Sequence, residues 1–287
     1  MRIGELSRRT GVSPELLRAW EQRYQLLRPS RSSGGFRLYS SSDEARVRRT
    51  AALIAQGLSA AEAARLAATE SAVEQESERP LVEDLASQLQ QALDAFDAGA
   101  AQGALDRLFA AVSVEFALAE VLIPYLHELG ARWAAGVVTV AQEHFASNII
   151  RARLVGLAQD WGAGGSPTSV AACLPGEAHD LGLVMLGLLM ARRGWQVTFL
   201  GADTPFESLE STVRSLRPSL VTLATYDAAV FDANADAIAR LAATTTVAVT
   251  APVEDEAIRR TGAEALGGDI PAAAAALASR VTQTKSV

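Results

Sequence analysis

The chain has 287 residues, of which 49% are hydrophobic, and its formal net charge at pH 7 is −7. This length and composition are enough for a globular protein of two or three domains. A single cysteine, Cys173, excludes a disulfide framework and a thiolate metal site, and no apolar run approaches the roughly 20 residues that span a bilayer. The opening MRIGELSRRTG lacks the apolar core of a signal peptide, so we expect a cytoplasmic protein with no membrane partner.

The charge is unevenly distributed along the chain. Residues 1–50 hold 11 Arg and no Lys against 5 Asp or Glu, so the rest of the chain carries a net charge of −13. Only the N-terminal end is therefore suited to bind a polyanion. A solvated basic face is the common alternative, and charge alone does not identify a DNA-binding domain.

The N-terminal segment IGELSRRTGVSPELLRAWEQRY predicts two helices joined by a turn. A short helix over about 3–9 precedes a turn at Thr10 and Gly11, and the second helix begins after Ser13 as its N-cap, with Pro14 at the first position. Apolar residues at helical spacing predict a small core, and the charged residues of the second helix are expected to face outward. The core set is Leu6, Val12, Leu16, Leu17 and Trp20, and the outward set is Glu15, Arg18, Glu21 and Arg23.

The next segment, SSGGFRLYSSSDEARVRR at residues 32–49, predicts a wing. It contains a Gly-Gly turn between basic and aromatic residues, followed by a helix that Ser42 or Asp43 would cap.

With the opening IGELSRRTGVSPELLRAWEQRYQLLRPSR and the wing GGFRLYSSSD, residues 1–70 resemble the MerR family of winged helix-turn-helix regulators. The resemblance implies that the helix over 13–24 enters the major groove of operator DNA, and that the wing holds phosphates or the minor groove. The DNA-binding candidates are Ser13, Glu15, Arg18, Arg23 and Tyr24 on the helix, and Arg37 and Tyr39 on the wing.

Residues 70–80, ESAVEQESERP, are polar and acidic and end in a proline, which predicts a linker. Apolar residues at helical spacing follow, and Gly99 and Gly103 are expected to interrupt the pattern. The predicted helices cover about 81–98, 104–112, 115–135 and 138–158. Joined by short turns, they make a four-helix bundle over 80–160, and DWGAGGSP then predicts a second linker.

The pattern changes over residues 166–287. The segments TSVAACL, QVTFLG, SLVTLATY and TTVAVTA are short, rich in β-branched residues and separated by helical stretches. This alternation predicts a Rossmann-like α/β domain with a doubly wound parallel sheet. Ligands of such sheets bind beyond the carboxyl ends of the strands, and the loop GEAHDLG at residues 176–182 lies at that position after the first strand.

The loop GEAHDLG combines residues that suit a flat, metal-centred ligand. The imidazole of His179 is a good ligand for a cobalt-like centre, Glu177 can fix its tautomer, and Gly182 lets a flat ligand approach the start of the next helix. A satisfied surface histidine is the ordinary alternative. The spacing Glu-x-His-x-x-Gly resembles the first signature of cobalamin-binding domains, which implies that His179 is the lower cobalt ligand and Glu177 its hydrogen-bonding partner.

The bundle contains a second pattern in RWAAGVVTVAQEHFAS, where nine residues separate Trp133 from Glu143 and His144, with a turn at Gly136. Taken alone, such an aromatic is more often core, and a Glu-His pair is often an exposed face. A bundle with these residues, followed by a sheet with GEAHDLG, resembles the CarH and LitR family of adenosylcobalamin-dependent photoreceptor repressors over essentially the whole chain.

This resemblance implies that Trp133 covers the adenosyl group, that Glu143 contacts it, and that His144 takes the upper cobalt position after light breaks the cobalt–carbon bond. It also implies a homo-oligomer, a tetramer in the dark that binds double-stranded operator DNA and comes apart in light.

Two segments depart from the cobalamin-domain pattern. The usual serine near the end of the third strand is replaced by Ala224, for which Thr222 or Thr225 could compensate. The usual Gly-Gly after the next strand is replaced by Thr250 and Ala251. Side chains at these positions would narrow the channel for the nucleotide tail of the cofactor.

Three alternatives to a cobalamin-dependent repressor remain open. A MerR-type regulator could hold another tetrapyrrole, a bilin or haem, or act without a cofactor. A corrinoid carrier protein would share the bundle and the sheet but has no reason for a basic winged helix. An enzyme is not expected, because the sequence has no phosphate-binding glycine loop and no nucleophile and base at recognisable spacing.

Overall fold

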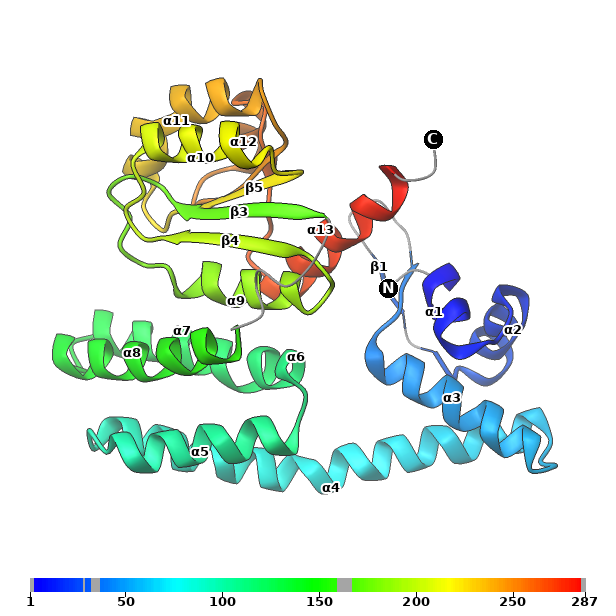
Figure 1. Cartoon of the computed structure of the whole chain (residues 1–287). Coiled ribbons are helices and arrows are strands. Elements are labelled where there is room, and N and C mark those ends of the chain that lie inside the picture. The colour runs from blue at the N-terminus through cyan, green and yellow to red at the C-terminus, as the bar shows by residue number, and fades with distance from the viewer. Residues whose placement is uncertain (1–2, 28, 32–36, 159–166, 285–287) are drawn as a thin grey trace. The chain divides into compact units, whose positions relative to one another are not determined.

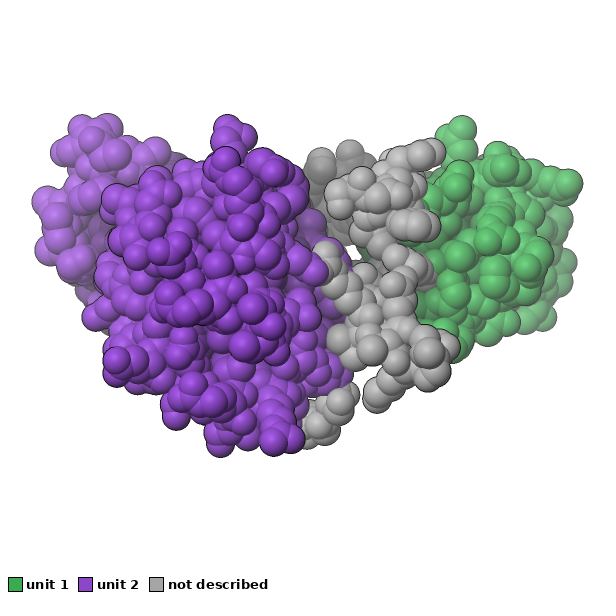
Figure 2. All heavy atoms as spheres, turned by 90° about the horizontal axis from the view of Figure 1, so that it is seen from above, with its two compact units in different colours: residues 1–84 green, residues 85–287 purple. Residues whose placement is uncertain are grey.

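The computed structural model describes residues 3–27, 29–31, 37–158 and 167–284 (Figure 1). The chain divides into two compact units, unit 1 at residues 1–84 and unit 2 at residues 85–287 (Figure 2). Each unit contains a hydrophobic cluster of its own. Among the described helices, none has the length and apolar character needed to cross a membrane.

Unit 1 is a helix-turn-helix with a two-stranded wing, as the sequence predicts. Its elements are α1 (Ile3–Thr10), α2 (Pro14–Tyr24), β1 (Ser30–Arg31), β2 (Arg37–Leu38), α3 (Ser41–Ala55) and the first part of α4 (Ala60–Asp94). The strands β1 and β2 pair antiparallel, with Ser30 opposite Leu38. The predicted Gly-Gly turn of the wing lies outside the described residues.

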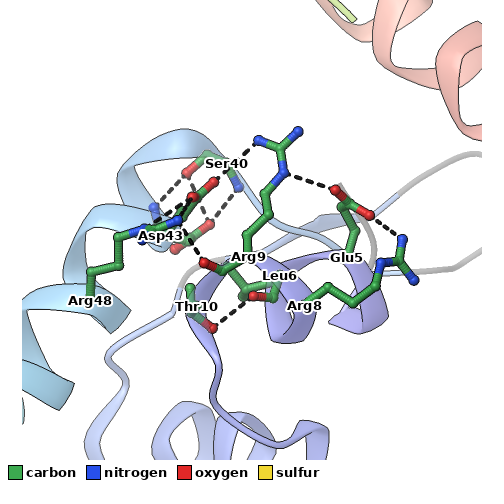
Figure 3. Close-up of polar contacts among 9 residues, drawn as sticks. Glu5, Leu6, Arg8, Arg9, Thr10, Ser40, Asp43 and Arg48 are labelled. Carbon is green, nitrogen blue, oxygen red and sulfur yellow. Dashed lines mark hydrogen bonds and ion pairs between the residues drawn. The ribbon is translucent and has the colours of Figure 1, made fainter. Parts of the chain in front are cut away.

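Caps fix the starts of two helices in unit 1. The Ser13 side chain accepts a hydrogen bond from the backbone N–H of Leu16 at 3.3 Å, as expected for the N-cap of α2. The predicted cap of α3 is wrong, because Ser40 takes that position and Asp43 completes a capping box with it (Figure 3). The Ser40 hydroxyl accepts from the Asp43 N–H at 3.0 Å, and the Asp43 carboxylate accepts from the Ser40 N–H at 2.8 Å.

The core of unit 1 contains four of the five predicted residues. Leu6, Val12, Leu17 and Trp20 are buried, whereas Leu16 is 45% exposed. Leu17 and Trp20 are three residues apart and share one face of α2, while Leu16 is rotated by about 100° from Leu17. Leu16 therefore lies beside the core rather than in it.

The linker predicted at residues 70–80 is wrong, because α4 runs through it without a break and contains Pro80. Glu, Gln, Ala and Arg dominate this segment, and these residues are good helix formers whether or not the helix is packed. A polar composition is therefore compatible with a continuous helix here. Pro80 removes one backbone donor, and the helix continues past it.

Unit 2 begins with the predicted four-helix bundle. Its helical segments are the last part of α4, α5 (Ala98–Ala111), α6 (Val114–Ala117), the π-helical turn η1 (Leu118–Leu122), α7 (Ile123–Ala134) and α8 (Val140–Leu157). Gly99 and Gly103 lie inside α5 and do not interrupt it. Asp97 caps this helix by accepting from the Ala100 N–H at 2.9 Å, which outweighs the weak helix preference of the two glycines.

The rest of unit 2 is the predicted doubly wound domain. Its strands are β3 (Thr168–Cys173), β4 (Gln196–Gly201), β5 (Leu220–Ala224), β6 (Val247–Thr250) and β7 (Glu264–Ala265), all parallel in the order β4-β3-β5-β6-β7. Its helices are α9 (Leu181–Ala191), α10 (Phe206–Leu216), α11 (Ala228–Ala242), α12 (Asp255–Arg260) and α13 (Ile270–Thr284). Helices α9 and α13 cover one face of the sheet, and α10, α11 and α12 cover the other (Figure 1).

Helix α9 explains why the bundle and the sheet pack together. Its residues 183–190 are all buried, because α9 contacts the sheet, α13 and α8 of the bundle. The strand order reverses at β3, which has β4 on one side and β5 on the other. Such a switch point opens a crevice at the carboxyl ends of the strands, and the loop between β3 and α9 lies there.

Candidate functional site

The loop between β3 and α9 is fastened to the ends of both neighbouring strands. The Leu174 N–H donates to the carbonyl of Ala224, the last residue of β5, at 3.0 Å. On the other side, Asp203 beyond β4 donates its N–H to the Glu177 carbonyl at 2.8 Å and accepts from the Gly176 N–H at 2.8 Å. Gly176 has a φ of +90°, which favours glycine at this turn. The loop therefore has a defined shape.

The buried Glu177 carboxylate is the centre of this site. Its Oε1 accepts from the backbone N–H of His179 at 2.8 Å and lies 2.6 Å from the His179 Nδ1. Its Oε2 accepts from the Thr225 hydroxyl at 2.9 Å and from the Tyr226 N–H at 2.6 Å. Burial raises the pKa of Glu177, but these hydrogen bonds outweigh it and hold the pKa below its usual value. Glu177 is therefore an ionised acceptor at neutral pH.

The His179 imidazole is held at one nitrogen and open at the other. A carboxylate only accepts hydrogen bonds, so the contact with Glu177 places the proton of a neutral imidazole on Nδ1 and leaves a lone pair on Nε2. The His179 side chain is 78% exposed. This arrangement orients a single nitrogen ligand, which suits a metal whose other positions are filled by a macrocycle.

Gly182 lies in the first turn of α9, where the sequence predicts room for a ligand. In the structure, a Cβ placed on Gly182 would overlap the Tyr226 hydroxyl. The Tyr226 ring also meets the His179 ring edge-on, with 6.3 Å between the ring centroids. Sequence reasoning did not single out Tyr226, because nothing in its neighbourhood along the chain indicates that it reaches α9.

A cavity of about 30 Å³ lies beside this tyrosine, at the position predicted for the tail channel. Among its lining residues are Gly182, Leu186, Ala224, Tyr226, Thr250 and Ile270. A cavity of this size holds about two water molecules. Ala224 and Thr250 thus face the cavity as expected, whereas Ala251 packs against the core of the sheet.

Neither Thr222 on β5 nor Thr225 just after it compensates for Ala224. The Thr225 hydroxyl donates to Glu177, and the Thr222 hydroxyl donates to the Val170 carbonyl at 3.4 Å. Both hydroxyls therefore hold the protein together, and neither residue lines the cavity.

The other predicted cofactor residues lie on the bundle, on either side of the turn between α7 and α8. Trp133 is 51% exposed near the end of α7, and Gly136, with a φ of +72°, forms the turn that leads to α8. His144 is exposed, and its Nε2 lies 3.7 Å from Oε2 of Glu143, whose Oε1 accepts from the Ser147 hydroxyl at 2.6 Å. Among the described residues, no hydrogen bond, ion pair or ring contact joins Trp133, Glu143 or His144 to His179.

An ion pair links α8 to the loop instead. Arg151 donates from Nε to Oδ1 of Asp180 at 2.8 Å and from Nη2 to Oδ2 at 2.6 Å. His144 and Arg151 are seven residues apart and share one face of α8, about 10 Å apart along its axis. His144 therefore lies on the side of α8 that meets the loop of His179. Sequence reasoning missed Arg151 and Asp180, because their pairing is not local.

The predicted DNA-binding side chains are in different environments. Arg18 and Arg23 are exposed on α2, and neither forms an ion pair within the described ranges. Arg37 is exposed but pairs with Glu21 at 2.7 Å. Tyr39 is buried, and its hydroxyl donates to Glu21 at 2.7 Å, so its ring is part of the core of unit 1.

The remaining predicted positions on α2 differ in their exposure. Glu15 is exposed and Tyr24 half-buried, while the hydroxyl of Ser13 is engaged as the helix cap. Glu21 is not free on the surface as predicted, because it joins α2 to the wing strand through Arg37 and Tyr39.

Several other arginines of unit 1 are paired with acids. Arg8 and Arg9 both bind Glu5, and Arg48 donates to the Arg9 carbonyl at 2.6 Å (Figure 3). Arg9 and Arg48 also reach Glu44, at 3.4 and 2.9 Å. Because these charges, like that of Arg37, are locally compensated, Arg18 and Arg23 are the stronger candidates for contacts with phosphate or bases.

Comparison with known proteins relates both parts of the chain to described families. Residues 1–70 match the MerR HTH family of regulatory proteins, and residues 85–155 match a B12 binding domain. The HTH-type transcriptional repressor CarH of Myxococcus xanthus is 36% identical over 233 residues, which cover 78% of each chain. The repressor CarA of the same organism is 38% identical over 226 residues, which cover 78% of this chain and 75% of CarA.

A solved structure shows the same fold as unit 2. The monomethylamine corrinoid protein of Methanosarcina barkeri has 18% sequence identity and a TM-score of 0.58, covering 69% of this chain and 98% of that protein.

Proposed function

The chain belongs to the family of the HTH-type transcriptional repressors CarH and CarA, and on this premise we propose that it is a DNA-binding repressor that carries a cobalamin. Unit 1 would bind operator DNA and unit 2 would hold the cofactor. The matches to MerR regulators and to a B12 binding domain support this division of roles. We propose a regulator rather than an enzyme or a corrinoid carrier, because a carrier has no use for a winged helix-turn-helix.

The contact between Glu177 and His179 is the observation that carries the proposal. The Oε1 of the buried Glu177 lies 2.6 Å from Nδ1 of His179 and fixes the imidazole tautomer. Nε2 is left exposed as a ligand for cobalt. An ordinary surface histidine needs no buried, ionised partner that is itself held by Thr225 and Tyr226. The residues of this loop therefore fit a corrinoid whose cobalt is bound by His179.

The finer proposal concerns the adenosyl form of the cofactor and light. Adenosylcobalamin would supply a cobalt–carbon bond that green or near-ultraviolet light breaks. On the bundle, the exposed Trp133 would cover the adenosyl group and Glu143 would contact it. His144, on the face of α8 that meets the loop, would become the second nitrogen ligand after illumination.

Assembly would transmit the signal to DNA. A single winged helix makes few base contacts, so several copies in one oligomer bind much more tightly through their effective concentration. We propose a tetramer in the dark and smaller species in light. The bundle needs only two arrangements relative to the sheet, and a change between them would act on the ion pair that joins Arg151 of α8 to Asp180.

The test is spectroscopic and compares the wild type with substitutions of two of the three histidines of the chain. Protein is mixed with adenosylcobalamin in the dark, desalted, and its bound corrinoid is recorded by absorbance. We expect His179→Ala to lose the spectrum of histidine-ligated cobalt and to bind less corrinoid. The control His127→Ala, an exposed residue of α7, should behave as the wild type. Equal spectra for all three proteins would remove His179 from the site.

The narrow cavity beside Tyr226 favours a second candidate ligand. A volume of about 30 Å³ does not accommodate a nucleotide tail without movement, whereas a haem or a bilin has none. The same desalting experiment with haem and with a bilin distinguishes the two, because retention of either in place of adenosylcobalamin would replace cobalamin in the proposal.

A further inference from the structure

Tyr226 lies between the exposed histidine and the cavity beneath the loop. Its ring contacts the His179 ring, and its side chain also lines the cavity. Its hydroxyl lies against Gly182, so closely that no side chain would fit there. A ligand that is bound to His179 and extends past the imidazole toward the cavity therefore contacts Tyr226 first.

The Tyr226 backbone is fixed, whereas its side chain is held only by packing. The backbone N–H donates to Glu177 at 2.6 Å. The hydroxyl makes no hydrogen bond within the described part of the chain, and the residue is 53% exposed. Rotation of the ring toward solvent therefore breaks no hydrogen bond and no ion pair.

With the ring in its present position, the cavity has room for about two water molecules. Apolar side chains form much of its wall, among them Leu186 and Ile270, and Thr250 stands where a glycine would leave space. A heterocyclic base on a nucleotide tail is several times larger than a water molecule. Its entry requires a lining side chain to move, and the Tyr226 ring, which is half-exposed and makes no hydrogen bond within the described residues, is free to rotate into solvent.

We propose that the Tyr226 side chain is a gate to the cavity. Through it, this protein distinguishes corrinoids that have a nucleotide tail from corrinoids that lack one. A corrinoid without a nucleotide tail binds His179 and leaves Tyr226 in place. A corrinoid with a tail binds only to molecules in which the ring has swung out, so its apparent affinity is reduced by the fraction of open molecules. This inference rests on the proposed function, because it takes a corrinoid as the ligand of His179.

The test compares two ligands on four proteins in the dark. Dissociation constants for adenosylcobalamin, which has a tail, and adenosylcobinamide, which lacks one, are measured by equilibrium dialysis with absorbance detection. The proteins are the wild type, Tyr226→Phe, Tyr226→Ala and the control Leu216→Ala, an exposed residue of α10 away from the cavity. Circular dichroism and thermal unfolding check that each variant is folded. All variants keep the backbone N–H that binds Glu177.

The measured quantity is the ratio of the cobalamin to the cobinamide dissociation constant. With an open fraction of about one tenth, the wild type should show a ratio near ten, Tyr226→Ala should lower it about tenfold, and Tyr226→Phe should lower it less. Leu216→Ala should leave it unchanged. A ratio that stays constant or rises in both Tyr226 variants overturns the gate, and if Tyr226→Ala does not fold, Tyr226→Phe decides. If no protein binds either corrinoid, the cobalamin proposal itself fails, and the gate with it.

Discussion

Replacing Glu177 by Gln exchanges one oxygen for an amide nitrogen and should release His179 from its present tautomer. Each oxygen of Glu177 accepts two hydrogen bonds. Both bonds to Oε1 come from His179, and the two bonds to Oε2 come from Thr225 and Tyr226. A glutamine has only one acceptor oxygen. If its nitrogen faces Tyr226, two donors oppose each other, and if it faces His179, the imidazole must accept at Nδ1 and protonate Nε2, which removes the metal ligand.

The magnitude follows from the hydrogen bonds that are lost. A buried N–H left without a partner costs about 1–3 kcal/mol, so we expect the free energy of unfolding to fall by about 2 kcal/mol. Loss of a carboxylate partner from a metal-binding histidine weakens metal affinity by about 10–100-fold, and we expect that range for adenosylcobalamin. The assays are urea unfolding of the cofactor-free protein and equilibrium dialysis in the dark.

Asp203→Asn is the matched control for Glu177→Gln. Asp203 is a carboxylate in the neighbouring loop whose Oδ1 accepts from the Gly176 N–H, and an amide keeps such an oxygen. We expect its cofactor affinity to be that of the wild type. Wild-type stability and affinity in Glu177→Gln would refute the assigned role of the carboxylate.

The same carboxylate makes stability depend on pH. The pKa of Glu177 in the folded protein is below the unfolded value of 4.5, so its contribution is fully present above pH 4.5. The contribution is lost as the pH falls through the lower, folded pKa. The difference in unfolding free energy between wild type and Glu177→Gln should thus be constant from pH 7 to 5 and shrink in more acidic solution.

Three further substitutions test other parts of the account. Arg18→Ala should weaken binding to operator DNA in gel-shift titrations by about 1–3 kcal/mol while the oligomer is preserved, and unchanged affinity would move the contact elsewhere. Asp43→Ala removes the capping box of α3 and the ion pair with Arg46, so the free energy of unfolding in urea should fall by about 2 kcal/mol. The control is Glu62→Ala, which replaces an exposed acid in the first turn of α4. A fall no larger than that of the control would contradict the role of Asp43. His144→Ala should leave dark assembly intact and shorten the lifetime of the illuminated state after fresh adenosylcobalamin is added, and an unchanged lifetime would exclude His144 as a ligand.

Local sequence signals predicted most of the fold. Ser13 and Pro14 mark the start of α2 because a cap and a missing N–H act within one helical turn. The β-branched segments at 168–174 and 219–226 contain β3 and β5, since buried parallel strands are apolar on both faces. The prediction of a linker at 70–80 was wrong, because Glu, Gln and Arg are common in linkers and are also good helix formers.

The candidate site was only partly visible in the sequence. Glu177 and His179 are two residues apart, so their contact is a local feature that spacing can indicate. The partners that hold Glu177 lie just after β5, 48 and 49 residues away, and Arg151 reaches Asp180 across 29 residues. These pairings exist only because the sheet places β3 beside β5 and because α8 packs on α9.

Size-exclusion chromatography with full-spectrum absorbance shows whether a light-sensitive corrinoid controls the assembly of this protein. Protein is mixed with adenosylcobalamin in the dark, separated, and separated again after green light. We expect corrinoid to elute with a tetramer in the dark, and we expect illumination to convert this peak to smaller species. Corrinoid absent from the protein peak, or a peak that illumination leaves unchanged, would contradict it.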